Sequence, residues 1–130
     1  MKNKNKTITF DAGNLYDANK QLVQQTCKPL TLTEIDEKQI ELIKWFKDIQ
    51  YAMLLCHDIR YFTVFILKHE IAEESERAAA HEVIGCLEDQ EGEILSIELQ
   101  KDNAWEIWLK KDDKVMAFYL FNYKQGIIKC

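Results

Sequence analysis

The last third of the chain alternates apolar and polar residues in three short runs, which cover residues 93–100, 104–110 and 115–121. Alternation with a period of two predicts β-strands, because successive side chains of a strand point to opposite faces of a sheet. The joining segments, residues 101–103 and 111–114, are short enough for hairpins. The pattern therefore predicts an antiparallel meander of three strands.

Upstream of the meander, the sequence predicts one longer strand and a helix. Residues 60–68, RYFTVFILK, are aromatic, β-branched and apolar on both faces, which predicts a central strand covered on both sides. Residues 73–89 carry apolar side chains at helical spacing, and Gly92 fits the stop that follows. Short strands are predicted at residues 7–10 and 127–129.

The first part of the chain predicts two helices. Asp11 has the character of an N-cap for a helix that runs to residue 26. Thr31 and Glu34 have the spacing of a capping box, which predicts a second, long helix from residue 31 to about residue 56. The resulting order is αα-β-α-βββ(β). The predicted fold class is α+β, with an antiparallel meander sheet between helix layers.

The two faces of the predicted meander differ in character, although a shift of one residue in the register of a strand would regroup its side chains. One face is uniformly apolar and should hold the main core: Leu95, Ile97, Leu99, Trp105, Ile107, Leu109, Met116, Phe118 and Leu120. The other face is mixed: Ser96, Glu98, Glu106, Trp108, Ala117, Tyr119 and Phe121.

The mixed face leaves two interpretations open. The long helix from residue 31 can cover it, which makes its aromatic rings ordinary core. Alternatively, Trp108, Tyr119 and Phe121 stay partly exposed inside a rim of Glu98 and Glu106, and they form a protein-binding patch. Sheet surfaces that bind RNA need lysine or arginine around such rings, so the carboxylates argue against nucleic acid here.

Length and composition indicate one ordinary globular domain. The 130 residues, 47% of them hydrophobic, predict a single domain over residues 1–130, with residues 1–6 as a flexible basic tail. No apolar run approaches the roughly 18 residues that span a membrane, and the N-terminus lacks the apolar region of a secretory signal. The four cysteines fit no zinc or disulfide-exchange pattern, which predicts a reduced, cytoplasmic protein without metal or cofactor.

Negative charge is concentrated in one quarter of the chain. The net charge is −5, but residues 69–102 alone hold two basic and eleven acidic side chains, a net charge of −9. Such a segment should repel nucleic acid directly and attract a basic protein partner. We therefore predict a protein-binding surface formed by Glu73, Glu74, Glu76, Glu82, Glu88, Asp89, Glu91 and Glu93.

Three function classes follow from these features. The first is a non-enzymatic inhibitor that blocks a basic protein such as a nucleic-acid enzyme, because spaced carboxylates can imitate DNA phosphates. Small acidic phage or mobile-element proteins of anti-CRISPR or immunity type offer an analogy in size and charge. The second is a structural module that forms a homodimer through the sheet face or the long helix.

The third class is a small metal or hydrolytic enzyme around His69 or His81. His69, Glu70 and Glu73 spell HExxE, but the zinc-protease motif requires a second histidine at the last position. The chain has no glycine-rich phosphate loop and no GxSxG motif. The sequence therefore favours binding over catalysis.

Overall fold

The computed structural model describes residues 8–49, 51–57, 62–68, 75–122 and 126–129. Within these ranges the helices are α1 (Ala12–Thr26), α2 (Leu32–Phe46) and α3 (Ser75–Glu88). The strands are β1 (Ile8–Asp11), β2 (Tyr51–His57), β3 (Phe62–Lys68), β4 (Glu93–Leu99), β5 (Trp105–Lys111), β6 (Lys114–Phe121) and β7 (Gly126–Lys129).

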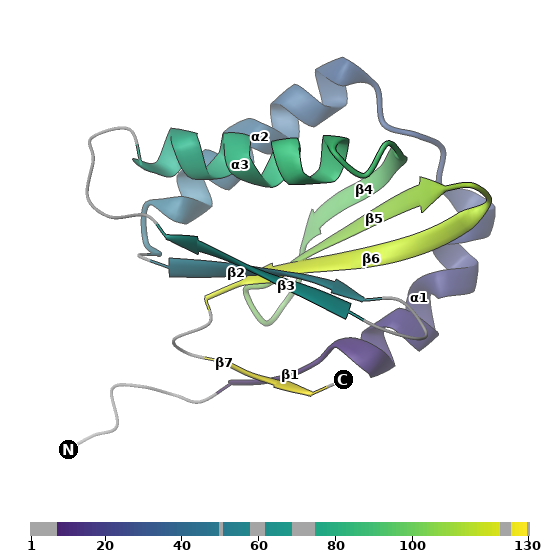
Figure 1. Cartoon of the computed structure of the whole chain (residues 1–130), viewed down its shortest axis with the longest axis horizontal. Coiled ribbons are helices and arrows are strands. Elements are labelled where there is room, and N and C mark those ends of the chain that lie inside the picture. The colour runs from purple at the N-terminus through teal and green to yellow at the C-terminus, as the bar shows by residue number, and fades with distance from the viewer. Residues whose placement is uncertain (1–7, 50, 58–61, 69–74, 123–125, 130) are drawn as a thin grey trace.

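Five of these strands form one antiparallel sheet in the order β3-β2-β6-β5-β4, and β1 pairs with β7 in a separate parallel ribbon. The α2 and α3 helices cover one face of the large sheet, whereas α1 covers the other (Figure 1). The predicted α+β class, the antiparallel meander and the helix/sheet/helix layers are confirmed.

The predicted long helix is wrong in its second half. The α2 helix ends at Phe46. Three backbone hydrogen bonds to the carbonyl three residues earlier follow, and the last runs from Ile49 N to Phe46 O at 3.1 Å. Residues 51–57, YAMLLCH, then form strand β2 between β3 and β6. An apolar run of this length fits a buried helix or a buried strand equally well by spacing. Here Leu54 and Leu55 fill opposite faces of the sheet, as a central strand requires.

The strand predicted over residues 60–68 is present as β3, but it lies at an edge of the sheet and not at its centre. Its neighbour β2 is an interior strand, with β6 on its other side at the centre of the sheet. The hairpin between β5 and β6 turns at Asp112 and Asp113, which both have positive φ angles of 51° and 62°. Aspartate tolerates this left-handed backbone conformation better than most residues. The two aspartates therefore suit the turn of the predicted hairpin.

The mixed face of the meander is covered by α1. The side chains of Trp108, Tyr119 and Phe121 are all buried, so the interpretation in which they form an exposed aromatic patch is wrong. The ring of Tyr16 from α1 stacks on Trp108 with centroids 5.4 Å apart, and the Tyr16 hydroxyl donates to the carbonyl of Val115 at 3.0 Å. The aromatic rings are core, as the first interpretation held, but α1 and not the helix from residue 31 covers them.

A β-bulge in β4 alters the predicted faces. Ile94 lies opposite Leu109 and Ser96 lies opposite Trp108, which leaves Leu95 between two paired positions. Leu95 therefore joins the core under α1, and Ile94 joins the core under α2 and α3 in its place. At the far end of the strand Leu99 is 48% exposed, so it adds little to the core it was assigned to.

Candidate protein-binding surface

The α3 helix separates its side chains into a buried and an exposed face. Ala79, Ala80, Val83, Ile84 and Leu87 are buried against α2 and the sheet. The outward face carries charged and small side chains: Arg77, Ala78, His81, Glu82 and Glu88. This division agrees with the amphipathic pattern of the sequence.

Five of the predicted binding residues are exposed on the second half of α3 and on the segment that follows it. Glu82 and Glu88 lie on α3, and Asp89, Glu91 and Glu93 follow on the turn into β4 and its first residue. All five are exposed, and we refer to them as the acidic surface. Of the other predicted residues, Glu76 is half-buried in the first turn of α3, while Glu73 and Glu74 lie outside the described residues.

The acidic surface is not neutralised by the lysines of the described part of the chain. Both ion pairs found there use Lys38, whose ammonium nitrogen lies 3.3 Å from Glu98 and 3.4 Å from Glu41. Burial lowers the pKa of Lys38, but the two carboxylates outweigh this effect and raise it overall. Neither pair includes a residue of the acidic surface, whose charge therefore faces solvent.

The position of this charge works against the helix that carries it. A helix has a partial negative charge at its carboxyl end, so acidic side chains there are unfavourable. Glu88 closes α3 and Asp89 follows directly, whereas the last turn holds no basic residue to offset them. Local stability alone would favour lysine or arginine here, and such departures from local rules are expected at functional sites.

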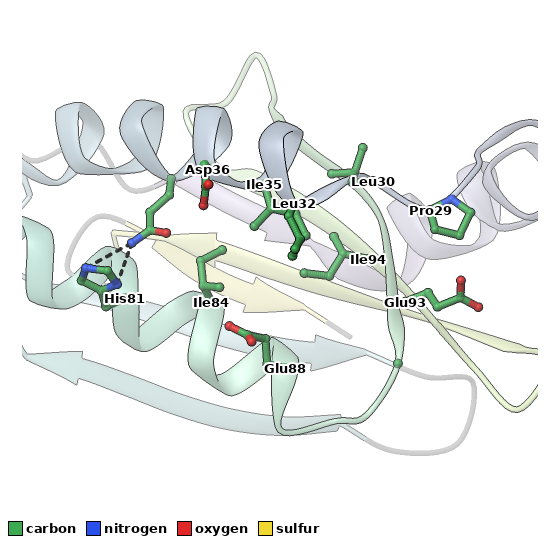
Figure 2. Close-up of a pocket in the computed structure, with 12 residues that line it drawn as sticks. Pro29, Leu30, Leu32, Ile35, Asp36, His81, Ile84, Glu88, Glu93 and Ile94 are labelled. Carbon is green, nitrogen blue, oxygen red and sulfur yellow. Dashed lines mark hydrogen bonds between the residues drawn. The ribbon is translucent and has the colours of Figure 1, made fainter.

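A groove lies beside the acidic surface, between α2, α3 and the start of β4. It encloses about 400 Å³, and Leu32, Ile35, Ile84 and Ile94 extend into it from three elements (Figure 2). Of the described residues that line it, three are carboxylates and none is lysine or arginine. The lining residues are Pro29, Leu30, Leu32, Ile35, Asp36, Gln39, His81, Ile84, Glu88, Gly92, Glu93 and Ile94.

Local interactions fix the walls of this groove. The capping box predicted from Thr31 and Glu34 is formed, with Glu34 N donating to Thr31 Oγ1 at 3.2 Å and Thr31 N donating to Glu34 Oε1 at 3.1 Å. Just before it, Leu30 N donates to the carbonyl of Ile94 at 2.7 Å, which ties the start of α2 to β4. At the other wall, a Cβ on Gly92 would lie 2.8 Å from both Leu109 Cγ and Lys110 O, so the turn approaches β5 too closely for a larger residue.

His81, a candidate in the enzyme hypothesis, is exposed at one end of the groove. Its Nδ1 lies 2.7 Å from the amide nitrogen of Gln39 on α2, in the contact drawn in Figure 2. Cys86 on the same helix is half-buried, and burial raises the pKa of its thiol, with Glu82 and Asp89 adding to the rise. A protonated thiol is a poor nucleophile, so this helix lacks an activated cysteine. His69, with Glu70 and Glu73, lies outside the described residues.

The burial of Glu106 was not predicted from the sequence. Only 6% of this residue is exposed, and Asn19 of α1 donates to its Oε2 at 3.1 Å. Burial raises the pKa of the Glu106 carboxyl, whereas the hydrogen bond from the Asn19 amide lowers it in part. Burial and the charge of Glu106 also raise the pKa of Tyr119, its cross-strand partner. This carboxylate lies in the core below α1 and not in the exposed rim that the second interpretation of the mixed face required.

No group of three or more metal-ligating side chains occurs among the described residues. The helices in that part of the chain are also too short or too polar to cross a membrane. Comparison with protein-family models, with curated proteins and with solved structures found no match for this chain.

Proposed function

We propose that this chain is a non-enzymatic binding protein whose acidic surface occupies a basic surface of another protein. The observation that carries the proposal is the placement of Glu88, Asp89 and their neighbours. These side chains are exposed, they lie outside the ion pairs of the described residues, and they gather where negative charge weakens their own helix. Charge that does not serve the fold is available for a partner.

The partner class that we propose is a nucleic-acid enzyme. Such enzymes hold phosphates in grooves lined by lysine and arginine, and a row of carboxylates can take the place of those phosphates. The chain would then act as an inhibitor in a phage or mobile-element setting, in the cytoplasm, and nucleic acid itself would be repelled. Complementary charge mainly accelerates encounter and selects the partner, so association should depend strongly on salt.

The homodimer hypothesis finds less support. Helices cover both faces of the large sheet, and α2 stops at Phe46, so neither of the two surfaces named for self-association is present as expected. Two copies that met through the acidic surface would repel each other.

The test uses charge reversal at two positions of the acidic surface that do not line the groove. The double variant Glu82→Lys/Glu91→Lys is compared with Asp17→Lys/Asp48→Lys, which changes the charge equally at exposed positions elsewhere. Each protein is immobilised, and association is recorded with a panel of purified bacterial nucleases and DNA-binding proteins of high isoelectric point. We expect a panel member to bind the wild type, and the first variant to associate about tenfold or more slowly than the control.

A second measurement asks whether binding blocks function. Fluorescent DNA bound to the same panel member should be released when the wild-type chain is added, and far less when the Glu82→Lys/Glu91→Lys variant is added. The proposal is wrong if no basic protein of the panel binds, or if both double variants slow association equally. In the latter case only the overall charge of the chain matters.

A further inference from the structure

We propose that the groove between α2, α3 and β4 receives a large apolar side chain of the partner, on a segment whose flanking residues are lysine or arginine. This inference rests on the proposed function and specifies how the partner is held. The acidic surface would attract the segment, and the groove would anchor it.

The apolar part of the argument starts from Leu32. This residue is the first of α2, and 81% of it is exposed although the capping box already fixes the start of the helix. Isolated exposed leucines are common on protein surfaces. Leu32, however, lines the groove together with Ile35 of its own helix, Ile84 of α3 and Ile94 of β4 (Figure 2). Leu32 and the half-buried Ile35 are the accessible apolar side chains of this lining, whereas Ile84 and Ile94 belong to the core beneath α2 and α3. An exposed apolar side chain in a groove with a polar rim is typical of a site for an apolar ligand group.

The size of the groove indicates what fits. Pockets that bind whole small molecules range from about 300 to about 1,000 Å³, and the volume here is near the lower limit. It accepts one or two large side chains but not the width of a helix, which is about 10 Å with its side chains. A buried aromatic or aliphatic anchor in such a pocket typically supplies most of the binding energy of an interface.

The charge of the rim indicates what flanks the anchor. Asp36 of α2 stands on one side, and Glu88 and Glu93 stand on the other. A segment with acidic flanks would be repelled from both sides, whereas lysine or arginine on either side of the anchor would meet a carboxylate. The groove and the acidic surface share Glu88 and Glu93, so one basic segment can contact both.

The experiment titrates the full chain, labelled with ¹⁵N, with four synthetic peptides of nine residues. One has a central tryptophan among lysines, and the second has serine in place of the tryptophan. The third has the tryptophan among glutamates, and the fourth carries it among uncharged serines. Chemical shifts of the backbone amides of Leu32, Ile35, Ile84 and Ile94 report on the groove.

We expect only the peptide with both tryptophan and lysines to shift all four groove amides to saturation. The Leu32→Ser variant should bind it at least five times more weakly, because the substitution removes an exposed apolar wall without disturbing the core. Leu22→Ser is the matched control, since Leu22 is 60% exposed on α1, across the sheet from the groove. It should leave the affinity unchanged.

The outcomes separate the groove from the proposed function. The groove proposal fails if the lysine peptide with serine binds as tightly as the lysine peptide with tryptophan. It also fails if Leu32→Ser does not weaken binding of the tryptophan and lysine peptide. In either case the proposed function still stands if Glu82→Lys/Glu91→Lys weakens peptide binding. In that case charge attraction stands alone. If the basic peptides give no shifts at millimolar concentration, or bind both double variants as well as the wild type, the proposed function loses its support too.

Discussion

Glu106 places a carboxylate in the core between α1 and the sheet, with Asn19 as its hydrogen-bond donor. Because its native pKa is raised, the native state holds this proton more tightly than the unfolded chain does. The stability that this adds is complete below the ordinary pKa of glutamate, and it is lost as the pH rises through the native pKa. Glu106→Gln keeps an acceptor for Asn19 and has no proton to lose.

We therefore expect urea unfolding of the wild type to show falling stability, relative to Glu106→Gln, as the pH rises above the ordinary pKa of glutamate and through the raised native pKa. The two proteins should be most similar at the acidic end, where Glu106 is neutral in both states of the wild type. If the stabilities of the wild type and of Glu106→Gln change in parallel with pH, burial does not raise the pKa of this carboxyl.

Two glycines of the chain should respond to alanine with opposite signs. In Gly92→Ala the new methyl group meets Leu109 Cγ and Lys110 O at 2.8 Å, so we expect a loss of about 1–3 kcal/mol from overpacking. In Gly85→Ala nothing lies within 4 Å of the new Cβ, and α3 gains about 0.5–1 kcal/mol because alanine favours helix. Denaturant unfolding of the two variants tests both signs. If Gly92→Ala is as stable as the wild type, the turn into β4 can shift to accept the methyl group.

At the scale of the element, α3 should be more stable when its carboxyl end loses negative charge. Asp89→Lys places a cation beside the last carbonyls of the helix, and we expect a gain of about 0.3–1 kcal/mol at low salt. Glu76→Lys is the reference, because the same change in the first turn should destabilise the helix. Thermal unfolding gives both values. If Asp89→Lys stabilises the fold and also slows partner association, stability has been exchanged for binding at this position.

The elements that the sequence predicted well are those that local interactions determine. The capping box of Thr31 and Glu34 needs only four consecutive residues, and its spacing was enough to identify the start of α2. The end of α2 was missed because Leu54 and Leu55 are buried on opposite faces, and a strand of this kind has no alternation to distinguish it. The bulge that turns Leu95 toward α1 was also missed, since register depends on pairing between strands.

At the scale of the whole molecule, charge could be predicted and shape could not. The excess of acidic residues after residue 69 is visible in the sequence, and exposure of Glu82, Glu88, Asp89, Glu91 and Glu93 follows from the amphipathic pattern of α3 and its polar turn. The groove needs Leu32, Ile84 and Ile94, which come from three elements that meet only through tertiary packing. Burial of Trp108 depends likewise on α1 crossing the sheet.

Concentrated negative charge should also govern the stability of the whole chain. Exposed like charges repel one another in the folded state, and salt screens this repulsion over about 10 Å at 0.1 M ionic strength. We expect added sodium chloride to raise the urea midpoint of the wild type. The rise should be smaller in Glu82→Lys/Glu91→Lys, because that variant relieves the repulsion locally, than in Asp17→Lys/Asp48→Lys, where the removed charges lie outside the acidic surface. Equal salt dependence in the two variants would mean that repulsion is spread evenly over the molecule. The acidic surface would then hold no excess electrostatic repulsion that a basic partner could relieve.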